Sequence, residues 1–139
     1  MQISGELFNN KIIIKKPKEV GRLFNKSHFG NTIEGNKLQI DLLEGVFLKS
    51  EEKIRLFQNK KELNFEDIVR IASQSISEFE IKYLTFKDLR NRGHKIKIFK
   101  ANDPIVFYQF KQKMDIKDSE KLFVVSIYSD RSFTFIFRV

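Results

Sequence analysis

Apolar residues that recur at every second position predict short strands near the start of the chain. Two such runs, Ser4–Phe8 and Lys11–Lys15, flank an Asn-Asn turn, and a third lies at Lys37–Ile40. The polar segment Asn31–Asn36 contains a glycine and predicts a loop or turn before the third run. The pattern therefore indicates a small, strand-rich beginning.

Apolar residues at the spacing of one helical face predict helices in the segments that follow. The first begins at Pro17, because proline is favoured in a first turn, and stops near Ser27–Gly30. Asp41 is expected to cap the second helix, and Asn64 with Asp67 approximates a capping box for the third. The apolar stripes of these helices are Val20, Leu23 and Phe24, then Leu42, Leu43, Val46 and Phe47, then Phe65, Ile68, Val69, Ala72 and Ile76.

A fourth helix is predicted over residues 78–92, after which the period returns to two. Ile81, Leu84 and Leu89 are expected to face inward, and Gly93 to end the helix in the left-handed conformation. Strands are then expected at Lys95–Phe99, Ile105–Phe110, Leu122–Tyr128 and Ser132–Val139, with a short polar helix or turn at Asp115–Lys121.

These elements predict an α/β (α+β) fold in two lobes. A small N-terminal αβ lobe is expected to span residues 1–62, and a helix-plus-sheet lobe residues 63–139. The boundary is placed at Gln58–Asn64, which is charged or polar apart from Leu63.

Composition narrows the class of protein. The 15 Phe among 139 residues must fill a core or form apolar patches that a partner covers. The chain has no Cys, which excludes disulfides and thiol chemistry within it. Residues 1–16 lack the pattern of a signal peptide, and no run approaches the roughly 18 apolar residues of a membrane span. We therefore expect a cytoplasmic protein with no membrane partner.

The net charge of +8, from 26 Lys and Arg against 18 Asp and Glu, favours a polyanionic partner. Nucleic acid is the first choice and an anionic membrane surface the second. A Lys-rich composition also follows from AT-rich coding or from life at high temperature. Charge alone indicates a direction without identifying the partner.

Few residues are suited to catalysis. His28 and His94 are the only histidines, and neither has a Cys, Asp or Glu at metal-ligand spacing, so no metal and no cofactor are expected. The densest group of cations lies within Lys87–His94, at the C-terminal end of the predicted fourth helix. Cations there either complement the negative end of the helix dipole or bind RNA phosphates, and both readings stay open.

The residues around this group resemble a known family. Tyr83–Lys97 is similar to the signature of archaeal tRNA-intron endonucleases, in which an aromatic-rich helix ends in a [K/E]-D-L-R-x-R-G stretch before a basic strand. Leu23–Gly30 and Leu38–Leu48 resemble parts of that family's N-terminal domain, and Lys121–Asp130 with the strand after it resembles its ending. The resemblance implies the family fold: an N-terminal αβ domain, then a catalytic-domain-like lobe of helices and a mixed sheet.

Catalytic members of this family cut introns at a bulge–helix–bulge RNA element without metal, leaving a 2′,3′-cyclic phosphate and a 5′-hydroxyl. A Tyr base, a His acid and a Lys carry the reaction, because attack by a 2′-hydroxyl needs proton removal, leaving-group protonation and charge neutralisation. Here Phe107 or Tyr108 falls at the Tyr position and Lys121 at the Lys position. No histidine lies between them, and Lys111–Glu120 is too short for the family's His-bearing strand and long helix.

The chain thus resembles the family's structural, non-catalytic subunits, with Tyr108 and Lys121 as remnants. The resemblance implies a catalytic partner subunit in an α2β2 heterotetramer that acts on precursor tRNA. The residues expected to contact RNA are Lys87, Arg90, Arg92, Lys95 and Lys97. Those expected at the subunit interface, from the last loop and last strand, are Asp130, Arg131, Phe133, Phe135 and Phe137.

Two other readings remain. The chain is an active nuclease if Tyr108 and Lys121 work with His94 or His28 brought in from elsewhere. It is a stand-alone RNA-binding or assembly module if it no longer acts in splicing.

Overall fold

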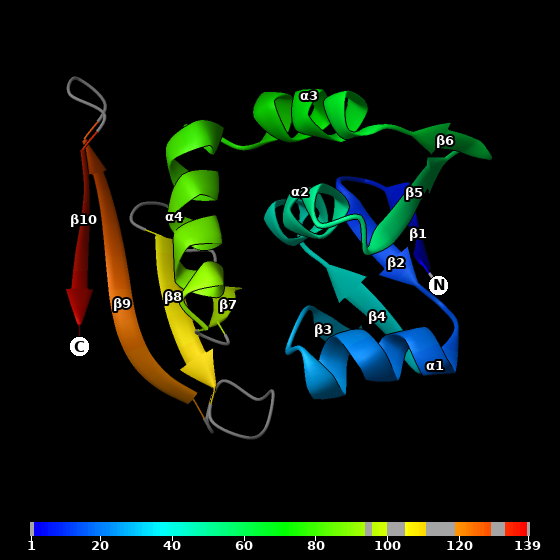
Figure 1. Cartoon of the computed structure of the whole chain (residues 1–139), viewed down its shortest axis with the longest axis horizontal. Helices are drawn as coiled ribbons and strands as arrows, with labels where there is room; N and C mark the ends of the chain where they lie inside the picture. Colours follow the sequence, from blue (N-terminus) through cyan, green and yellow to red (C-terminus); the bar gives the residue numbers. More distant parts are fainter. Residues whose placement is uncertain (1, 94–95, 100–104, 111–118, 129–132, 139) are drawn as a thin grey trace. The chain divides into compact units, whose positions relative to one another are not determined.

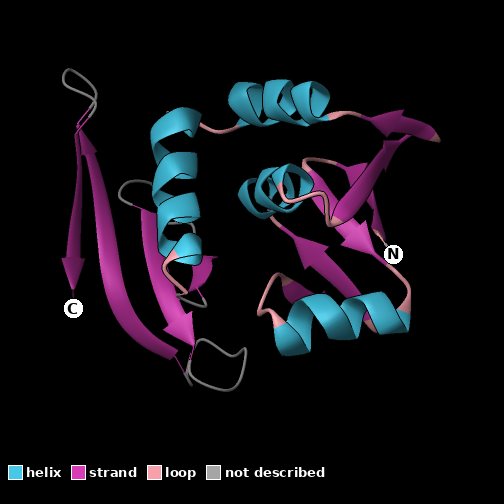
Figure 2. Ribbon diagram, viewed as in Figure 1, coloured by secondary structure: helices cyan, strands magenta, loops and turns pink. Residues whose placement is uncertain are grey.

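The computed structural model describes residues 2–93, 96–99, 105–110, 119–128 and 133–138, with side chains for residues 2–93. The chain forms two compact units, Met1–Phe79 and Glu80–Val139, which are described separately (Figure 1). Helices and strands occur in both units, which confirms the predicted α+β class (Figure 2).

A six-stranded mixed sheet forms the centre of the first unit. Its strands are β1 (Ile3–Phe8), β2 (Lys11–Ile14), β3 (Asn31–Ile33), β4 (Lys37–Ile40), β5 (Ile54–Gln58) and β6 (Lys61–Leu63), in the order β3-β4-β2-β1-β5-β6. β1 and β5 are parallel, and every other pair in this sheet is antiparallel. The Asn9–Asn10 turn between β1 and β2 has φ angles of 49° and 60°, the left-handed pair that suits a tight hairpin.

Helices cover one face of this sheet. They are α1 (Pro17–Val20), the π-helical turn η1 (Gly21–Lys26), α2 (Leu42–Ser50) and α3 (Phe65–Ser75). α2 packs against β2 and β5, and α3 packs against α2 and β6. Gly45 of α2 lies so close to Ile12 of β2 that a Cβ would collide with its side chain. Fully buried residues such as Leu38 and Leu56 fill the space between the layers.

Both predicted helix caps in this unit are confirmed. The Asp41 carboxylate accepts from the Leu43 N–H at 2.9 Å, while Glu44 accepts from the Asp41 N–H at 2.9 Å. Asn64 and Asp67 form the reciprocal pair at 2.8 and 3.0 Å. These bonds satisfy first-turn donors that have no partner within the helix.

Three features of the first unit differ from the sequence expectation. The predicted loop at 31–36 contains a strand, β3, because the turn is confined to the residues after Ile33. The first helix ends near Ser27 as predicted, but its second part, Gly21–Lys26, is the π turn η1. β5 and β6 were not predicted, and they occupy part of the polar stretch taken as a boundary.

The expected domain boundary after residue 62 falls within β6, inside the first compact unit. α3 belongs with this unit because it packs on α2 and β6. As a boundary between evolutionary domains, residue 62 stays a prediction.

The second unit holds most of α4 (Phe79–Asn91) and a four-stranded sheet. The strands β7 (Ile96–Phe99), β8 (Ile105–Phe110), β9 (Ser119–Tyr128) and β10 (Phe133–Arg138) follow the order β10-β9-β8-β7. All three pairs are antiparallel, so the mixed sheet lies in the first unit and not in this one. β9 includes Ser119–Lys121, where a polar helix or turn was expected; residues 115–118 lie outside the described ranges.

The buried face of α4 differs from the predicted one. Leu89 is buried as expected, but Leu84 is 61% exposed. The buried positions are instead Phe79, Lys82 and Phe86, together with Thr85, whose hydroxyl donates to the Ile81 carbonyl at 2.9 Å.

Candidate functional site

The end of α4 carries the first group of candidate residues. The helix closes with the Gly93 N–H donating to the Arg90 carbonyl at 3.0 Å, and Gly93 has a φ of +89°. This confirms the predicted left-handed stop. Lys87 and Arg90 therefore lie in the last turns of α4, and Arg92 directly follows its end, where cations are favoured by the helix dipole.

These three cations differ in accessibility. Lys87 and Arg92 are exposed, whereas Arg90 is half-buried with its guanidinium 5.6 Å from the centroid of the Phe86 ring. Arg92 pairs with Asp88 at 3.1 Å, a surface contact worth only about 0–1 kcal/mol. Lys87 and Arg92 are thus placed to reach a phosphate, while Arg90 packs against the helix.

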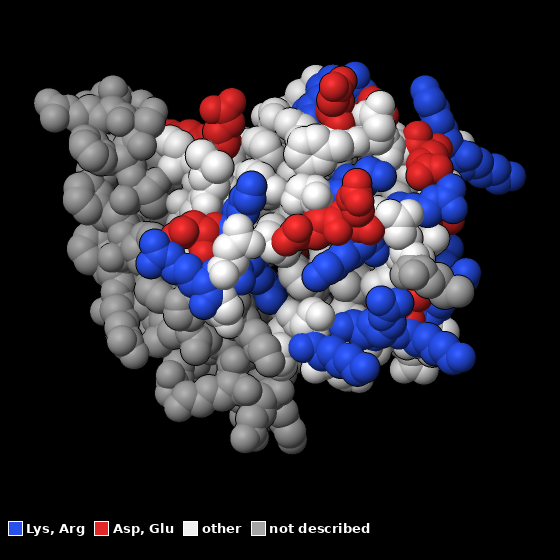
Figure 3. All heavy atoms as spheres, in the orientation of Figure 1, with Lys and Arg blue, Asp and Glu red and all other residues white. Residues whose placement is uncertain are grey.

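On the face shown in Figure 3, each unit carries basic side chains, and acidic side chains lie among them. Of the remaining RNA-contact candidates, Lys95 lies outside the described residues, and Lys97 is placed by the backbone of β7 alone.

The sheet register brings the two expected catalytic remnants together. Tyr108 of β8 is the direct cross-strand neighbour of Lys121 of β9, and Lys97 of β7 is its neighbour on the other side. The row Lys97–Tyr108–Lys121 therefore crosses three adjacent strands. The register shifts between Phe107 and Tyr108, and such bulges commonly accompany functional sites in sheets.

Sequence reasoning missed this row. The few apolar residues of Asp115–Lys121 predict a polar helix or turn there, which would separate Lys121 from the strands. A strand assignment for Ser119–Lys121, with the antiparallel pairing that follows, would have put Tyr108 beside Lys121.

The two histidines are not equally placed for chemistry. His28 follows η1 in the first unit, is 4% exposed and has a φ of 59°. A general acid must come within hydrogen-bond reach of its substrate, and burial works against that. His94 lies outside the described residues.

The expected interface residues fall in the last loop and the last strand. Phe133, Phe135 and Phe137 alternate along β10, which among the described strands pairs with β9 alone and so forms one edge of the four-stranded sheet. An edge strand presents unpaired backbone groups that another strand can bind. Asp130 and Arg131 lie outside the described residues.

Two features are absent from the described residues. No three His, Cys, Asp or Glu side chains among them come together as metal ligands. No described helix is long and apolar enough to cross a membrane.

Comparison with known proteins gives the same family as the sequence signature. The family described as "tRNA intron endonuclease, N-terminal domain" matches residues 3–69. A tRNA-splicing endonuclease of Thermococcus onnurineus is 34% identical over 95 residues, covering 68% of this chain and 55% of its own length. One from Methanothermobacter thermautotrophicus is 32% identical over 97 residues, covering 70% of this chain and 55% of its own length.

The match to Pyrococcus abyssi tRNA-splicing endonuclease is of the same kind, 33% identical over 91 residues. It covers 66% of this chain and 53% of that protein, so this chain spans about half the length of the curated relatives it matches. The N-terminal domain and the aligned relatives lead to one conclusion: the chain belongs to the tRNA-splicing endonuclease family.

Proposed function

We propose that this chain is a structural, non-catalytic subunit of a tRNA-splicing endonuclease. In this role it supports a catalytic partner, in an α2β2 heterotetramer, that cuts bulge–helix–bulge introns in precursor tRNA. The observation that carries the proposal is the row Lys97–Tyr108–Lys121. It keeps a base position and a charge-stabilising position side by side, and the stretch between Tyr108 and Lys121 contains no histidine to serve as the acid.

The missing acid is the decisive loss. Cleavage by a 2′-hydroxyl requires protonation of the departing 5′-oxygen, and a positioned acid contributes about 10²- to 10⁴-fold. His28 is poorly suited to replace it, since only 4% of the residue is exposed. A Tyr and a Lys without the acid fit a remnant better than a working site.

The remaining candidate residues take roles within this proposal. Lys87 and Arg92, both exposed, contact phosphates of the RNA together with Lys95 and Lys97. Arg90 supports them by stacking on Phe86.

The subunit contacts come from the last strand and its preceding loop. The edge strand β10, with Phe133, Phe135 and Phe137, pairs with the partner subunit, and Asp130 and Arg131 contribute charged contacts. Covering this edge also removes an aggregation hazard.

A second candidate is an active nuclease that uses His94 as its acid. The adjacency of Tyr108 and Lys121 in the register favours it, because two of three catalytic positions remain paired. Substituting His94→Ala separates the two candidates, since only the active nuclease loses cleavage.

The test is a metal-free cleavage assay on a labelled bulge–helix–bulge RNA. This chain, a catalytic subunit from the same source, and their mixture are compared, with the complex checked by size-exclusion chromatography. We expect no cleavage by this chain alone and cleavage by the mixture. Cleavage by this chain alone, abolished by His94→Ala, would replace the proposal with the active nuclease. Separate elution of the two proteins at micromolar concentration would contradict the proposed heterotetramer.

A further inference from the structure

The first unit leaves one face of its sheet without a helix. Ile12 and Leu56 point toward the helical layer and are fully buried. Side chains at the alternate positions point to the opposite face of the sheet. Among them, Ile13 and Phe57 are half-buried and Glu6 is exposed. The register sets Glu6 between Ile13 and Phe57 in one row of this free face.

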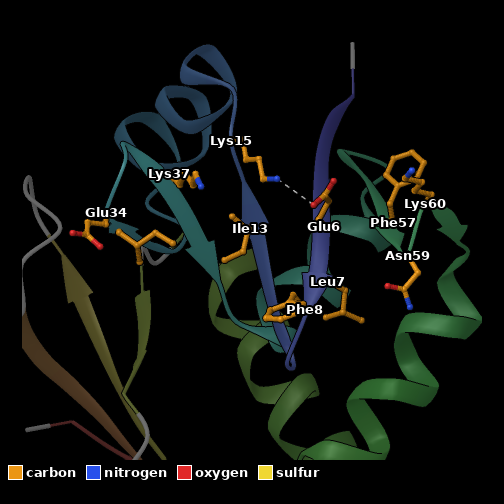
Figure 4. Close-up of a pocket in the computed structure, with 11 residues that line it drawn as sticks. Glu6, Leu7, Phe8, Ile13, Lys15, Glu34, Lys37, Phe57, Asn59 and Lys60 are labelled. Atoms are coloured by element: carbon orange, nitrogen blue, oxygen red, sulfur yellow. Dashed lines mark hydrogen bonds and ion pairs between the residues drawn. The ribbon is translucent and has the colours of Figure 1, made fainter.

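The free face is hollowed. A depression of about 470 Å³ lies over β1, β2, β4 and β5 (Figure 4). Its lining includes Phe8, Ile13, Phe57, Lys15, Lys37 and Lys60. A second hollow of about 270 Å³ shares Ile13, Lys15 and Phe57 with the first, so the depression extends toward α1 at Lys16 and Glu19.

Two aromatic rings are available in the first hollow. Phe8, at the end of β1, is 69% exposed, so its ring is accessible to a ligand. Phe57 is half-buried, and the guanidinium of Arg55 lies 5.2 Å from its ring centroid. Glu62 holds that guanidinium with two hydrogen bonds of 2.7 and 3.2 Å.

Three lysines and two glutamates, Glu6 and Glu34, line the hollow around these rings, which leaves one net positive charge. Lys15 pairs with Glu6 at 3.3 Å across the floor, and Lys37 and Lys60 stand at the rim without an ion pair among the described residues. One exposed ring, Phe8, and one half-buried ring, Phe57, with lysines nearby suit a ligand that is both flat and anionic. Nucleotides meet that description, whereas an apolar protein surface gains nothing from the lysines.

We propose that this free sheet face binds unpaired nucleotides of RNA. Bases stack on Phe8 and on the Arg55–Phe57 pair, and phosphates lie toward Lys37 and Lys60. The RNA must be unpaired there, because only unstacked bases expose the faces that aromatic rings bind. The proposal rests on the chain's work on RNA, and it adds a site in the first unit that the proposed function does not assign.

The test measures binding of a fluorescein-labelled oligouridine of about ten nucleotides to the full chain by anisotropy. Two variants change the site, Phe8→Ala and Lys60→Glu. Each has a matched control outside the hollow: Phe65→Ala, an aromatic that is 42% exposed on α3, and Lys61→Glu, the adjacent exposed lysine. Circular dichroism verifies that all four fold.

We expect Phe8→Ala to weaken binding about tenfold or more, as removal of one stacked base does. Lys60→Glu should weaken it less and lower the salt slope by about one. Both controls should bind nearly as the parent does, and a blunt RNA duplex should bind equally to Phe8→Ala and to the parent.

Equal oligouridine affinity for Phe8→Ala and Phe65→Ala would overturn the proposal. So would a loss of self-association in Phe8→Ala with oligouridine binding unchanged, because the face would then be a contact between copies. Neither outcome changes the result expected in the cleavage assay, so the structural-subunit role is tested separately.

Discussion

The two units of this chain carry very different charge on similar amounts of sequence. Residues 1–79 contain 13 Lys and Arg against 11 Asp and Glu, a net charge of +2, while residues 80–139 contain 13 against 7, a net charge of +6. Under the proposed function, the second unit therefore supplies most of the long-range attraction for RNA. The first unit instead has exposed aromatic rings, such as Phe8, which attract a ligand only when it is in direct contact with them.

The units also differ in how their sheets are protected. The sheet of the first unit has a helical layer over one face, with fully buried residues such as Ile12 and Leu38 beneath it. The sheet of the second unit ends at β10, an edge strand with three phenylalanines. Both sheets end in edge strands, but β3 and β6 of the first unit have three residues each, whereas β10 has six and offers a longer edge to a partner.

The largest expected effect breaks the core of the first unit. Leu56→Ala in the central strand β5 should lower the free energy of unfolding by about 2–5 kcal/mol, since Leu56 is fully buried. Leu84→Ala, at a position that is 61% exposed, should cost less than about 0.5 kcal/mol. Urea titration followed by circular dichroism measures both. Equal losses would contradict the assigned burial.

Reversing charge in the second unit tests where RNA attraction arises. The double variant Lys87→Glu with Arg92→Glu should lower affinity for precursor tRNA about tenfold and reduce the salt slope by about two. Lys26→Glu with Lys53→Glu makes the same charge change at exposed sites of the first unit and should have a smaller effect. Filter binding across a salt series gives both quantities. If the two double variants behave alike, the charge asymmetry has no functional meaning.

Local signals in the sequence predicted the helices better than the strands. Asp41 and Asn64 each predict the start of a helix, because their side chains can cap its first turn, and both caps are present. β5 was missed because Arg55 and Gln58 interrupt its apolar run, and its place beside β1 depends on a parallel contact between distant segments. The inward prediction for Leu84 failed because the buried stripe of α4 follows Phe79, Lys82 and Phe86 instead.

The candidate site was predictable in its residues but not in its geometry. The signature around Arg90 and Gly93 is local in sequence, whereas the row through Tyr108 and Lys121 exists only through strand register. The accessibility of Phe8 also needed the structure, since its alternation pattern alone does not reveal which face the helices cover.

Removing a helix cap should have a moderate effect. Asn64→Ala should destabilise the chain by about 1 kcal/mol, because the Asp67 N–H loses its acceptor at the start of α3. Asn64→Asp keeps the acceptor and should stay close to the parent. Thermal unfolding of the three proteins provides the measurement, and an unchanged midpoint for Asn64→Ala would argue against the capping box.

The smallest effect concerns pH. The hydrogen bond from Arg55 holds the pKa of Glu62 below its usual value of 4.5. The folded-state pKa is therefore lower than the unfolded one, so the pair contributes stability above that unfolded value and loses it as the pH falls through the folded pKa. Glu62→Gln should make unfolding slightly less sensitive to acid below about pH 4.5 and leave the slope near pH 7 unchanged. Identical acid profiles for variant and parent would show that the pair does not persist in solution.

The central claim is that this chain supports cleavage without performing it. Its most direct test is the single-turnover cleavage rate of the reconstituted complex when this chain carries Tyr108→Phe and Lys121→Ala together. We expect a rate within about twofold of the parent complex, because the catalytic groups belong to the partner. A loss of about a hundredfold or more, the usual cost of removing a catalytic proton-transfer group, would contradict it and place the chemistry in this chain.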